Sequence, residues 1–238
     1  MQNLQKTSPT PNIPPPSAPE KNAEEKSLFE ILEKLPPNSV LKLYEQTWAD
    51  YEDLLEAVGE ASGLRISYDE GTLQIMTLSA EHESYAQTII RLVSLFSVFR
   101  RIEIQFFGSA TIKKSRYEKG AEPDACFYIQ TAAKIGNRIT LDFSVDPAPD
   151  VAVEIDLHHE SLYKFPIYAA LGVSEVWRYD GVKLEIHELE NGKYLTKEKS
   201  AALPILTAEL LTDFLNRSRT ETQSKILFAF EDWLKEQA

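Results

Sequence analysis

Apolar residues recur at every third or fourth position in the segment that follows Ser79. The series consists of Tyr85, Ile89, Leu92, Val93, Phe96 and Phe99. This spacing predicts a long helix with one buried face, and Ser79 is suited to cap its N-terminus. Alternating or continuous apolar stretches surround this helix and predict strands instead. They are residues 64–68, 72–78, 102–107, a strand through 110 and 112, 124–129 and 151–157.

Further helices and strands are predicted on either side of this central part. Thr47 is followed three residues later by Asp50, a capping-box pattern that predicts a helix to about Val58. Pro166 suits only the first turn of a helix, and Gly172 suits a helix C-terminus. The remaining predicted elements are helices at 27–35, 161–171, 207–216 and 221–236, a hairpin of 175–180 and 183–189, and an edge strand at 194–197.

The order of these elements predicts an α/β fold. Its core runs helix, three strands, helix, strand, with a leading helix and hairpin before it and C-terminal helices from about residue 207 after it. Residues 1–26 are rich in Pro, Ser, Asn and Lys and have almost no aromatic residues. Such a segment cannot bury enough apolar surface to become ordered, so we predict a disordered tail. Residues 27–238 are then expected to form a single domain.

Composition narrows the possible functions. The formal net charge of −12 argues against a large basic nucleic-acid footprint, but it is compatible with metal-binding carboxylates. The one cysteine, Cys126, allows no internal disulfide and reads as a small buried residue of a strand. The sequence has no run of about 18 apolar residues and no apolar signal-peptide core. We therefore expect a cytoplasmic protein without a membrane span.

Three carboxylates are candidates for binding a divalent cation. Glu154 and Asp156 lie two residues apart in a predicted strand, so alternation places both on one face, and Asp124 begins another strand. Acids on one face of a core strand repel each other, and a divalent cation would offset that repulsion. Oxygen donors favour Mg²⁺ or Mn²⁺ over zinc. The alternative interpretation is a half-exposed strand whose acids face solvent.

Lys164 follows this strand on the next predicted helix, from which it could reach back over the strand end. A lysine beside a metal can stabilise the charge of a pentavalent phosphate or orient the attacking water. Taken alone, a helical lysine is more often only solvated. Tyr168, one turn later, could share the face of Lys164, or could simply be packed.

A basic segment precedes Asp124. Four cations stand against one acid between residues 111 and 119, and they are Lys113, Lys114, Arg116 and Lys119. On a loop, such a segment could follow a phosphate backbone. A solvated hairpin tip is the alternative interpretation.

These motifs together resemble the bacterial Uma-two family of restriction endonucleases. The resemblance rests on Glu-Pro-Asp at 122–124, Pro-Asp-Val-Ala-Val-Glu-Ile-Asp at 149–156 and the segment 164–180, and it extends to Gly-Thr-Leu-Gln-Ile-Met at 71–76 and Glu-His-Glu at 81–83. It covers roughly residues 47–215 and implies the PD-(D/E)xK nuclease fold, whose core has the element order given above.

The resemblance also implies roles for individual residues. Asp124 matches the motif aspartate and Glu154 the motif glutamate, while Asp156 stands where the superfamily lysine is usual. Lys164 would be that lysine, migrated to the next helix. Members often carry a further glutamate on the first core helix, for which Glu81 and Glu83 are both candidates. His82, in the same turn, is either an accessory to the site or a structural histidine.

The function that follows is a divalent-metal-dependent endonuclease acting on DNA. Asp124, Glu154 and Asp156 are expected to hold Mg²⁺ or Mn²⁺, and Asp124, Glu154 and Lys164 to be catalytic. Dimerisation is common in the superfamily, which suggests a homodimer. Two alternatives remain open: a non-catalytic nucleic-acid- or protein-binding module on the same fold, and a metal-dependent phosphodiesterase acting on a small nucleotide.

Overall fold

The structure is a computed structural model that describes residues 28, 30–59 and 63–237. The chain divides into two units, Met1–Pro36 and Pro37–Ala238. The tail predicted at 1–26 lies outside the described residues, and the predicted domain boundary stays a prediction. The helix predicted at 27–35 is helical at residues 28 and 30–32 and has ended by residue 33.

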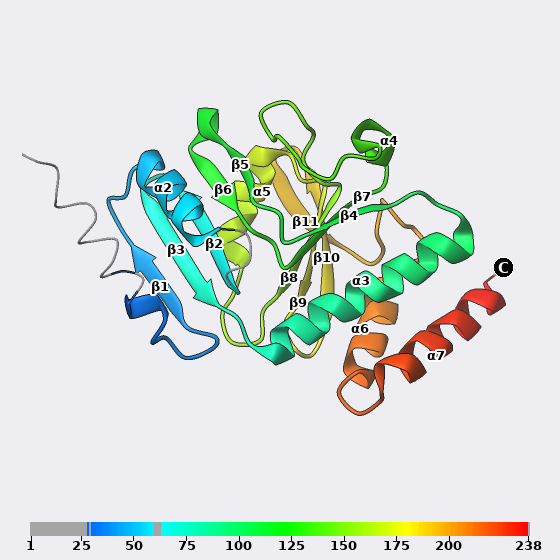
Figure 1. Cartoon of the computed structure of the whole chain (residues 1–238). Helices are drawn as coiled ribbons and strands as arrows, with labels where there is room; N and C mark the ends of the chain where they lie inside the picture. Colours follow the sequence, from blue (N-terminus) through cyan, green and yellow to red (C-terminus); the bar gives the residue numbers. More distant parts are fainter. Residues whose placement is uncertain (1–27, 29, 60–62, 238) are drawn as a thin grey trace, which may run out of the picture. The chain divides into compact units, whose positions relative to one another are not determined.

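The second unit contains two β-sheets (Figure 1). The first sheet is antiparallel throughout, in the order β1 (Val40–Leu43), β3 (Thr72–Thr77), β2 (Leu64–Asp69), β6 (Lys119–Ala121) and β5 (Ile112–Lys114). The second sheet has the order β11 (Lys193–Lys197), β10 (Leu184–Glu190), β9 (Glu175–Tyr179), β8 (Val151–Ile155), β7 (Ala125–Tyr128) and β4 (Gln105–Gly108). In this second sheet, β8 and β9 pair in parallel.

Helices cover both faces of the second sheet. α3 (Ala80–Arg100), α6 (Ala208–Arg217) and α7 (Gln223–Glu236) contribute to the larger apolar core on one face. α5 (Phe165–Leu171) packs on the other face and connects β8 to β9. A parallel pair needs such a crossover, because a tight turn can only join antiparallel strands. Two further helices are α2 (Trp48–Val58) and the short α4 (Ala132–Ile135).

The predicted core order is confirmed within the second sheet. It runs α3, β4, β7, β8, α5, β9, which is helix, three strands, helix, strand. The predicted strand through residues 110 and 112 is β5, which belongs to the other sheet and forms a hairpin with β6. The predicted strand at 102–107 is shifted to Gln105–Gly108, since residues 102–104 are the connection that leaves α3.

Local signals account for the helix ends. Thr47 and Asp50 form the expected capping box of α2, and Ser79 accepts a hydrogen bond from the His82 amide at the start of α3. Pro166 lies in the first turn of α5, and Gly172 ends that helix with a positive φ of 89°. Residues 162–164 form a separate 3-10 turn, so α5 is shorter than the predicted helix 161–171.

Strand β8 separates its side chains onto the two faces of the sheet. Val151, Val153 and Ile155 belong to the core formed with α3, whereas Ala152 packs with α5. Alternation then turns the Glu154 side chain towards α5 as well. The prediction that Glu154 lies on the opposite face of the strand from Val153 and Ile155 is confirmed. Glu154 can therefore act on the side of the sheet that α5 covers.

Burial makes the thiol of Cys126 unreactive. The thiol is 1% exposed in β7, and burial raises its pKa to about 12. The native protein at pH 8 is therefore expected to react with a thiol reagent at least about 1,000-fold more slowly than the guanidinium-unfolded chain, because the thiolate is the reacting species. Absorbance of the released thionitrobenzoate measures both rates. Comparable rates in the two states would show that β7 is open to solvent.

Among the helices that the structure describes, none combines the length and the apolar character needed to cross a membrane.

The C-terminal helix α7 packs on α3 and α6 but leaves Phe228 64% exposed. The homodimer suggested by the sequence stays a prediction.

Candidate active site

Asp124 is held where β7 and β8 meet. It directly precedes β7, and its amide donates to the Val153 carbonyl at 2.9 Å. Its Oδ2 accepts a hydrogen bond from the Ile155 amide at 2.8 Å. Asp124 lies just before β7, and its side-chain oxygen accepts the hydrogen bond that a strand carbonyl would otherwise accept. This contact fixes the carboxylate in one position.

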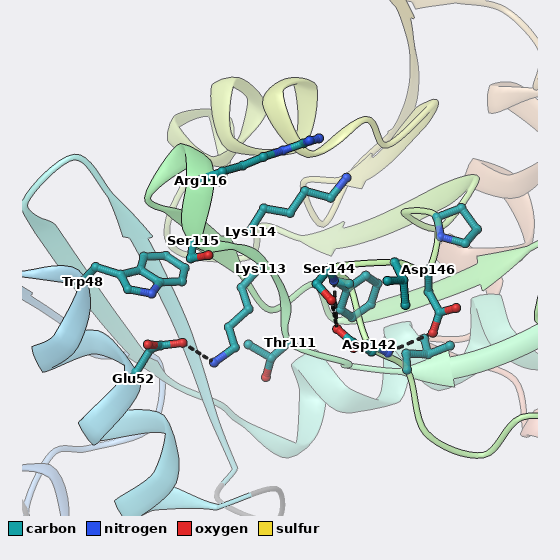
Figure 2. Close-up of a pocket in the computed structure, with 14 residues that line it drawn as sticks. Trp48, Glu52, Thr111, Lys113, Lys114, Ser115, Arg116, Asp142, Ser144 and Asp146 are labelled. Atoms are coloured by element: carbon teal, nitrogen blue, oxygen red, sulfur yellow. Dashed lines mark hydrogen bonds and ion pairs between the residues drawn. The ribbon is translucent and has the colours of Figure 1, made fainter.

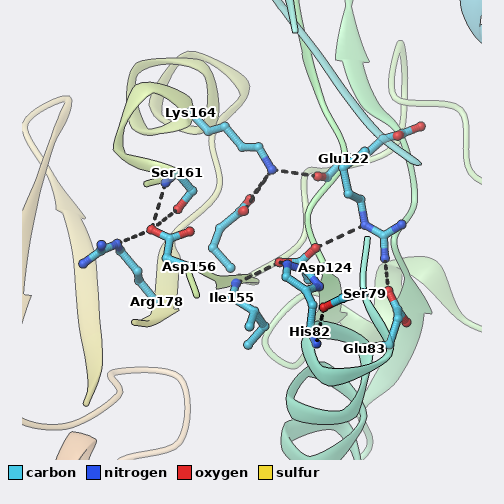
Figure 3. Close-up of polar contacts among 12 residues, drawn as sticks. Ser79, His82, Glu83, Glu122, Asp124, Ile155, Asp156, Ser161, Lys164 and Arg178 are labelled. Atoms are coloured by element: carbon cyan, nitrogen blue, oxygen red, sulfur yellow. Dashed lines mark hydrogen bonds and ion pairs between the residues drawn. The ribbon is translucent and has the colours of Figure 1, made fainter. Parts of the chain in front are cut away.

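Two basic groups lie beside the Asp124 carboxylate, and one of them, His82, is labelled in Figure 3. Arg65 Nε lies 3.2 Å from Oδ1, and His82 Nε2 lies 3.2 Å from Oδ2. Burial alone would raise the pKa of Asp124, but His82, Lys164 and Arg65 together outweigh it and lower the pKa. Asp124 is therefore an anion in the folded protein.

Several buried polar atoms around Asp124 lack well-aligned hydrogen-bond partners within the described part of the chain. They are Asp124 Oδ1, Arg65 Nε and both ring nitrogens of His82. These atoms lie close to opposite charges but lack aligned hydrogen bonds, so their capacity to donate or accept a hydrogen bond is unused. Asp124 Oδ1 is thus an oxygen that is able to bind a further ligand.

Glu154 and Lys164 form a buried ion pair beside Asp124. Lys164 Nζ donates to both oxygens of Glu154, at 3.0 and 2.8 Å, and to the Glu122 carbonyl at 3.1 Å. The hydroxyl of Tyr168 donates to Glu154 Oε1 from the next turn. The two charged residues are 1% and 2% exposed. The sequence expectation that Lys164 reaches back over the strand therefore agrees with its placement.

The environment moves the pKa values of both partners upward. Burial raises the pKa of Glu154 to about 7, with Lys164 opposing it and Asp124 and Asp156 adding to it. For Lys164, burial disfavours the cation, but Glu154, Tyr163 and Asp124 outweigh it, so its pKa is raised. Lys164 is held as a cation next to a carboxyl group that titrates near neutrality.

Asp156 is directed to other partners. Its Oδ2 accepts from the Ser161 amide at 2.8 Å, from the Ser161 hydroxyl at 3.1 Å and from Arg178 Nε. Arg178 stands opposite Glu154 in the β8–β9 register and also lies 3.5 Å from Glu185. The predicted strand 151–157 ends at Ile155, so Asp156 follows β8, and its carboxylate joins the loop to β9.

The residues expected from the first core helix differ in their positions. His82 is buried against Asp124, whereas Glu83 forms a 2.9 Å ion pair with Arg65 and is 41% exposed. Glu81 is exposed. His82 and Glu83 are therefore joined to the site, the latter through Arg65.

Sequence reasoning missed the two arginines of the site. Arg65 and Arg178 are each the single charged residue within an apolar strand segment, Leu-Arg-Ile and Val-Trp-Arg-Tyr. A cation in such a position is rarely buried without a carboxylate partner. That pattern is the signal which could have linked them to Asp124 and Asp156.

The four basic residues at 113–119 do not act alike. Lys113 pairs with Glu52 at 3.1 Å, and Lys119 pairs with Asp69 and Glu70. Lys114 donates to the Leu171 carbonyl, and Arg116 lies 4.5 Å from the centre of the Tyr117 ring. Three of the four, excluding Lys119, line a pocket of about 690 Å³ (Figure 2).

The donor set for a metal is small. Among the described residues, no group of three or more His, Cys, Asp or Glu side chains is arranged to hold an ion. Mg²⁺, however, keeps several waters and is often bound through only one or two carboxylates. Asp124 fits that requirement through Oδ1, which has an ion pair with Arg65 but no aligned hydrogen bond. Glu154 would fit it by exchanging a contact with Lys164 or Tyr168 for the ion. The metal-binding role expected of Asp156 stays a prediction, because its contacts with Ser161 and Arg178 all involve Oδ2.

Comparisons with known proteins agree with the fold. The model of the Uma2 family, described as "Putative restriction endonuclease", matches residues 48–218. Among solved structures, the chain is similar to a "putative nuclease belonging to DUF820" from Anabaena variabilis ATCC 29413, with 15% identity and a TM-score of 0.50. That match covers 69% of this chain and 98% of the other. No curated protein matches the chain.

Proposed function

The chain belongs to the Uma2 family, and from its site we propose that it is a divalent-metal-dependent endonuclease that hydrolyses phosphodiester bonds in DNA. The family description supports a nuclease in general terms. The metal dependence and the DNA substrate are our proposal.

One observation carries this proposal most directly. A lysine and a glutamate are buried together at 2% and 1% exposure, next to a buried aspartate from the neighbouring strand. Burying an ion pair is seldom favourable for stability, since desolvation offsets the attraction. Strongly shifted titratable groups that cluster in this way are typical of active sites.

The residues divide the chemical work as follows. Asp124 and Glu154 would hold Mg²⁺ or Mn²⁺, which when bound acts as a Lewis acid on the scissile phosphate and lowers the pKa of a water. Lys164 places a permanent cation where negative charge develops on the phosphate. Arg65 and His82 keep Asp124 ionised, and Tyr168 fixes the orientation of Glu154.

The test compares the wild-type protein with Glu154→Gln in two assays. Calorimetry measures Mg²⁺ and Mn²⁺ binding, and plasmid nicking measures cleavage. We expect the variant to lose more than about 100-fold in both, because the loss of a second-shell partner alone costs about 10- to 100-fold. Glu160→Gln is the matched control, since Glu160 is exposed in the loop after β8. Circular dichroism verifies that each variant is folded.

The outcomes separate the candidate functions. Metal binding without cleavage of DNA would contradict the endonuclease and favour the small-nucleotide phosphodiesterase or the binding module. The absence of metal binding in the wild type would exclude the metal-dependent mechanism altogether. Loss of metal binding and nicking in Glu154→Gln, but not in Glu160→Gln, supports the proposal.

A further inference from the structure

We propose that the pocket beside Trp48 binds an unpaired segment of nucleic acid, with one base against the indole and phosphates at Lys114 and Arg116. This inference rests on the proposed nuclease function and names the form of its substrate. It starts from two neighbouring pockets, their charges and their connection to Asp124.

Three walls form the first pocket (Figure 2). Trp48 and Glu52 come from α2, the basic residues come from β5 and the turn after it, and the segment 141–147 closes the far side. Trp48 is half-buried and packs edge-to-face with Tyr51 and Tyr68, at ring-centre distances of 5.1 and 5.7 Å. The core thus holds the indole in a fixed position at the pocket wall.

Two cations in this pocket have no carboxylate partner in the part of the chain that the structure describes. Lys114 Nζ contacts a carbonyl, and Arg116 contacts an aromatic ring. Burial, and after it the nearby Arg116, lower the pKa of Lys114, so an anion bound between the two side chains would favour the lysine cation. Lys113, by contrast, is already paired with Glu52. Lys114 and Arg116 are therefore the phosphate-binding pair.

A second pocket of about 480 Å³ adjoins the first and is lined by two residues that contact the candidate active site. It shares Thr111, Leu141 and Phe143 with the first pocket, and Arg65 and Glu122 line it. Arg65 touches Asp124, and the Glu122 carbonyl accepts from Lys164. We infer that the two adjoining pockets form one groove from Trp48 towards Arg65 and Glu122, which would bring a chain bound at Trp48 close to the candidate site.

The chemistry of the groove fits unpaired bases better than a duplex. Duplex binding depends on many cations spread along two backbones, whereas this chain has a net charge of −12 and offers two uncompensated cations here. A basic groove with an aromatic side chain is the usual arrangement for single strands, since every base can stack on a ring. Asp142 at the far wall is exposed, and its carboxylate, whose Oδ1 accepts from Ser144, can also accept from base amino groups.

Fluorescence anisotropy with a labelled 15-nucleotide mixed-sequence strand, in EDTA, tests the inference. We expect the strand to bind at least about tenfold more tightly than a hairpin duplex of the same sequence. Trp48→Leu should weaken strand binding about tenfold or more, as expected for loss of one stacked base. Lys114→Ala and Arg116→Ala should each reduce the slope of log affinity against log salt by about 0.7.

Controls keep the test independent of folding and of cleavage. Lys193→Ala, in an exposed residue of β11 that lines neither pocket, should leave binding unchanged. Trp48→Phe retains a ring in the core and should bind more tightly than Trp48→Leu, and thermal melting verifies that both are folded.

Equal affinity for strand and duplex, or unchanged binding by a folded Trp48→Leu, would overturn the inference. Absence of strand binding would overturn it too. If the wild type still nicks plasmid in that case, the nuclease proposal stands and only the substrate form is wrong. If nicking is absent as well, both proposals fail.

Discussion

Replacing Lys164 with methionine is expected to lower the free energy of unfolding by about 3–5 kcal/mol at pH 8.5. Methionine keeps most of the volume of the side chain but removes the cation that donates to both oxygens of Glu154. Among the residues that the structure describes, Tyr168 would then be the remaining side-chain donor to a buried Glu154 anion. Urea unfolding curves at fixed pH measure the loss.

The loss should depend on pH in a defined direction. The pKa of Glu154 is raised to about 7 in the folded wild type, above its value of about 4.3 in an unfolded chain. Without Lys164 it rises further. A raised acid favours the folded state at low pH and loses that contribution as pH increases. Lys164→Met should therefore be much closer to the wild type in stability at pH 5.5 than at pH 8.5.

Two further variants test the physical cause. The double variant Lys164→Met/Glu154→Gln should recover much of the stability at pH 8.5, because no buried charge remains. Lys113→Met breaks an ion pair whose side chains are 37% and 47% exposed, and it should cost less than about 1 kcal/mol. A small, pH-independent loss for Lys164→Met would contradict the description of this pair as buried and charged.

Asp124→Asn and Asp156→Asn are expected to fail in different ways. Asp124→Asn should reduce plasmid nicking by more than about 100-fold, beyond the effect of removing a second-shell group. It keeps the oxygen that accepts from the Ile155 amide. Asp156→Asn should instead cost about 3 kcal/mol of stability by weakening the contact with Arg178. Its folded fraction should nick at close to the wild-type rate.

Nicking rates normalised to the folded fraction distinguish the two aspartates. Arg178 keeps Glu185 as a second partner, so Asp156→Asn should remain folded at 20 °C. Equal loss of nicking in both variants would return Asp156 to the proposed metal-binding set. Normal nicking by Asp124→Asn would remove Asp124 from it.

Local pattern was sufficient to place Glu154. The side-chain period of a strand is two, so Val153 and Ile155 on the core face determine the face of Glu154. The same argument placed Asp156 on that face but could not identify its partners. Arg178 becomes a neighbour only through the parallel pairing of β8 with β9, and that register is not encoded in either strand alone.

The basic segment shows the same limit. In the sequence, the four basic residues at 113–119 form one group because they are close together. The hairpin of β5 and β6 joins the other sheet, where Lys119 meets Asp69 and Glu70 at the end of β2. Lys113 and Lys119 pair with acids that are distant in the sequence. Lys114 and Arg116 have no carboxylate partner among the described residues. Charge counts along a sequence cannot make that distinction.

The parallel pair β8–β9 also determines when the site can exist during synthesis. Arg65, Asp124 and Lys164 are far apart in sequence, and β8 acquires its parallel neighbour only after α5 and β9 have left the ribosome. Contacts of such long range form late in folding. Until then, we expect Glu154 and Lys164 to stay hydrated. The arrangement thus delays assembly of the site until most of the domain has been translated.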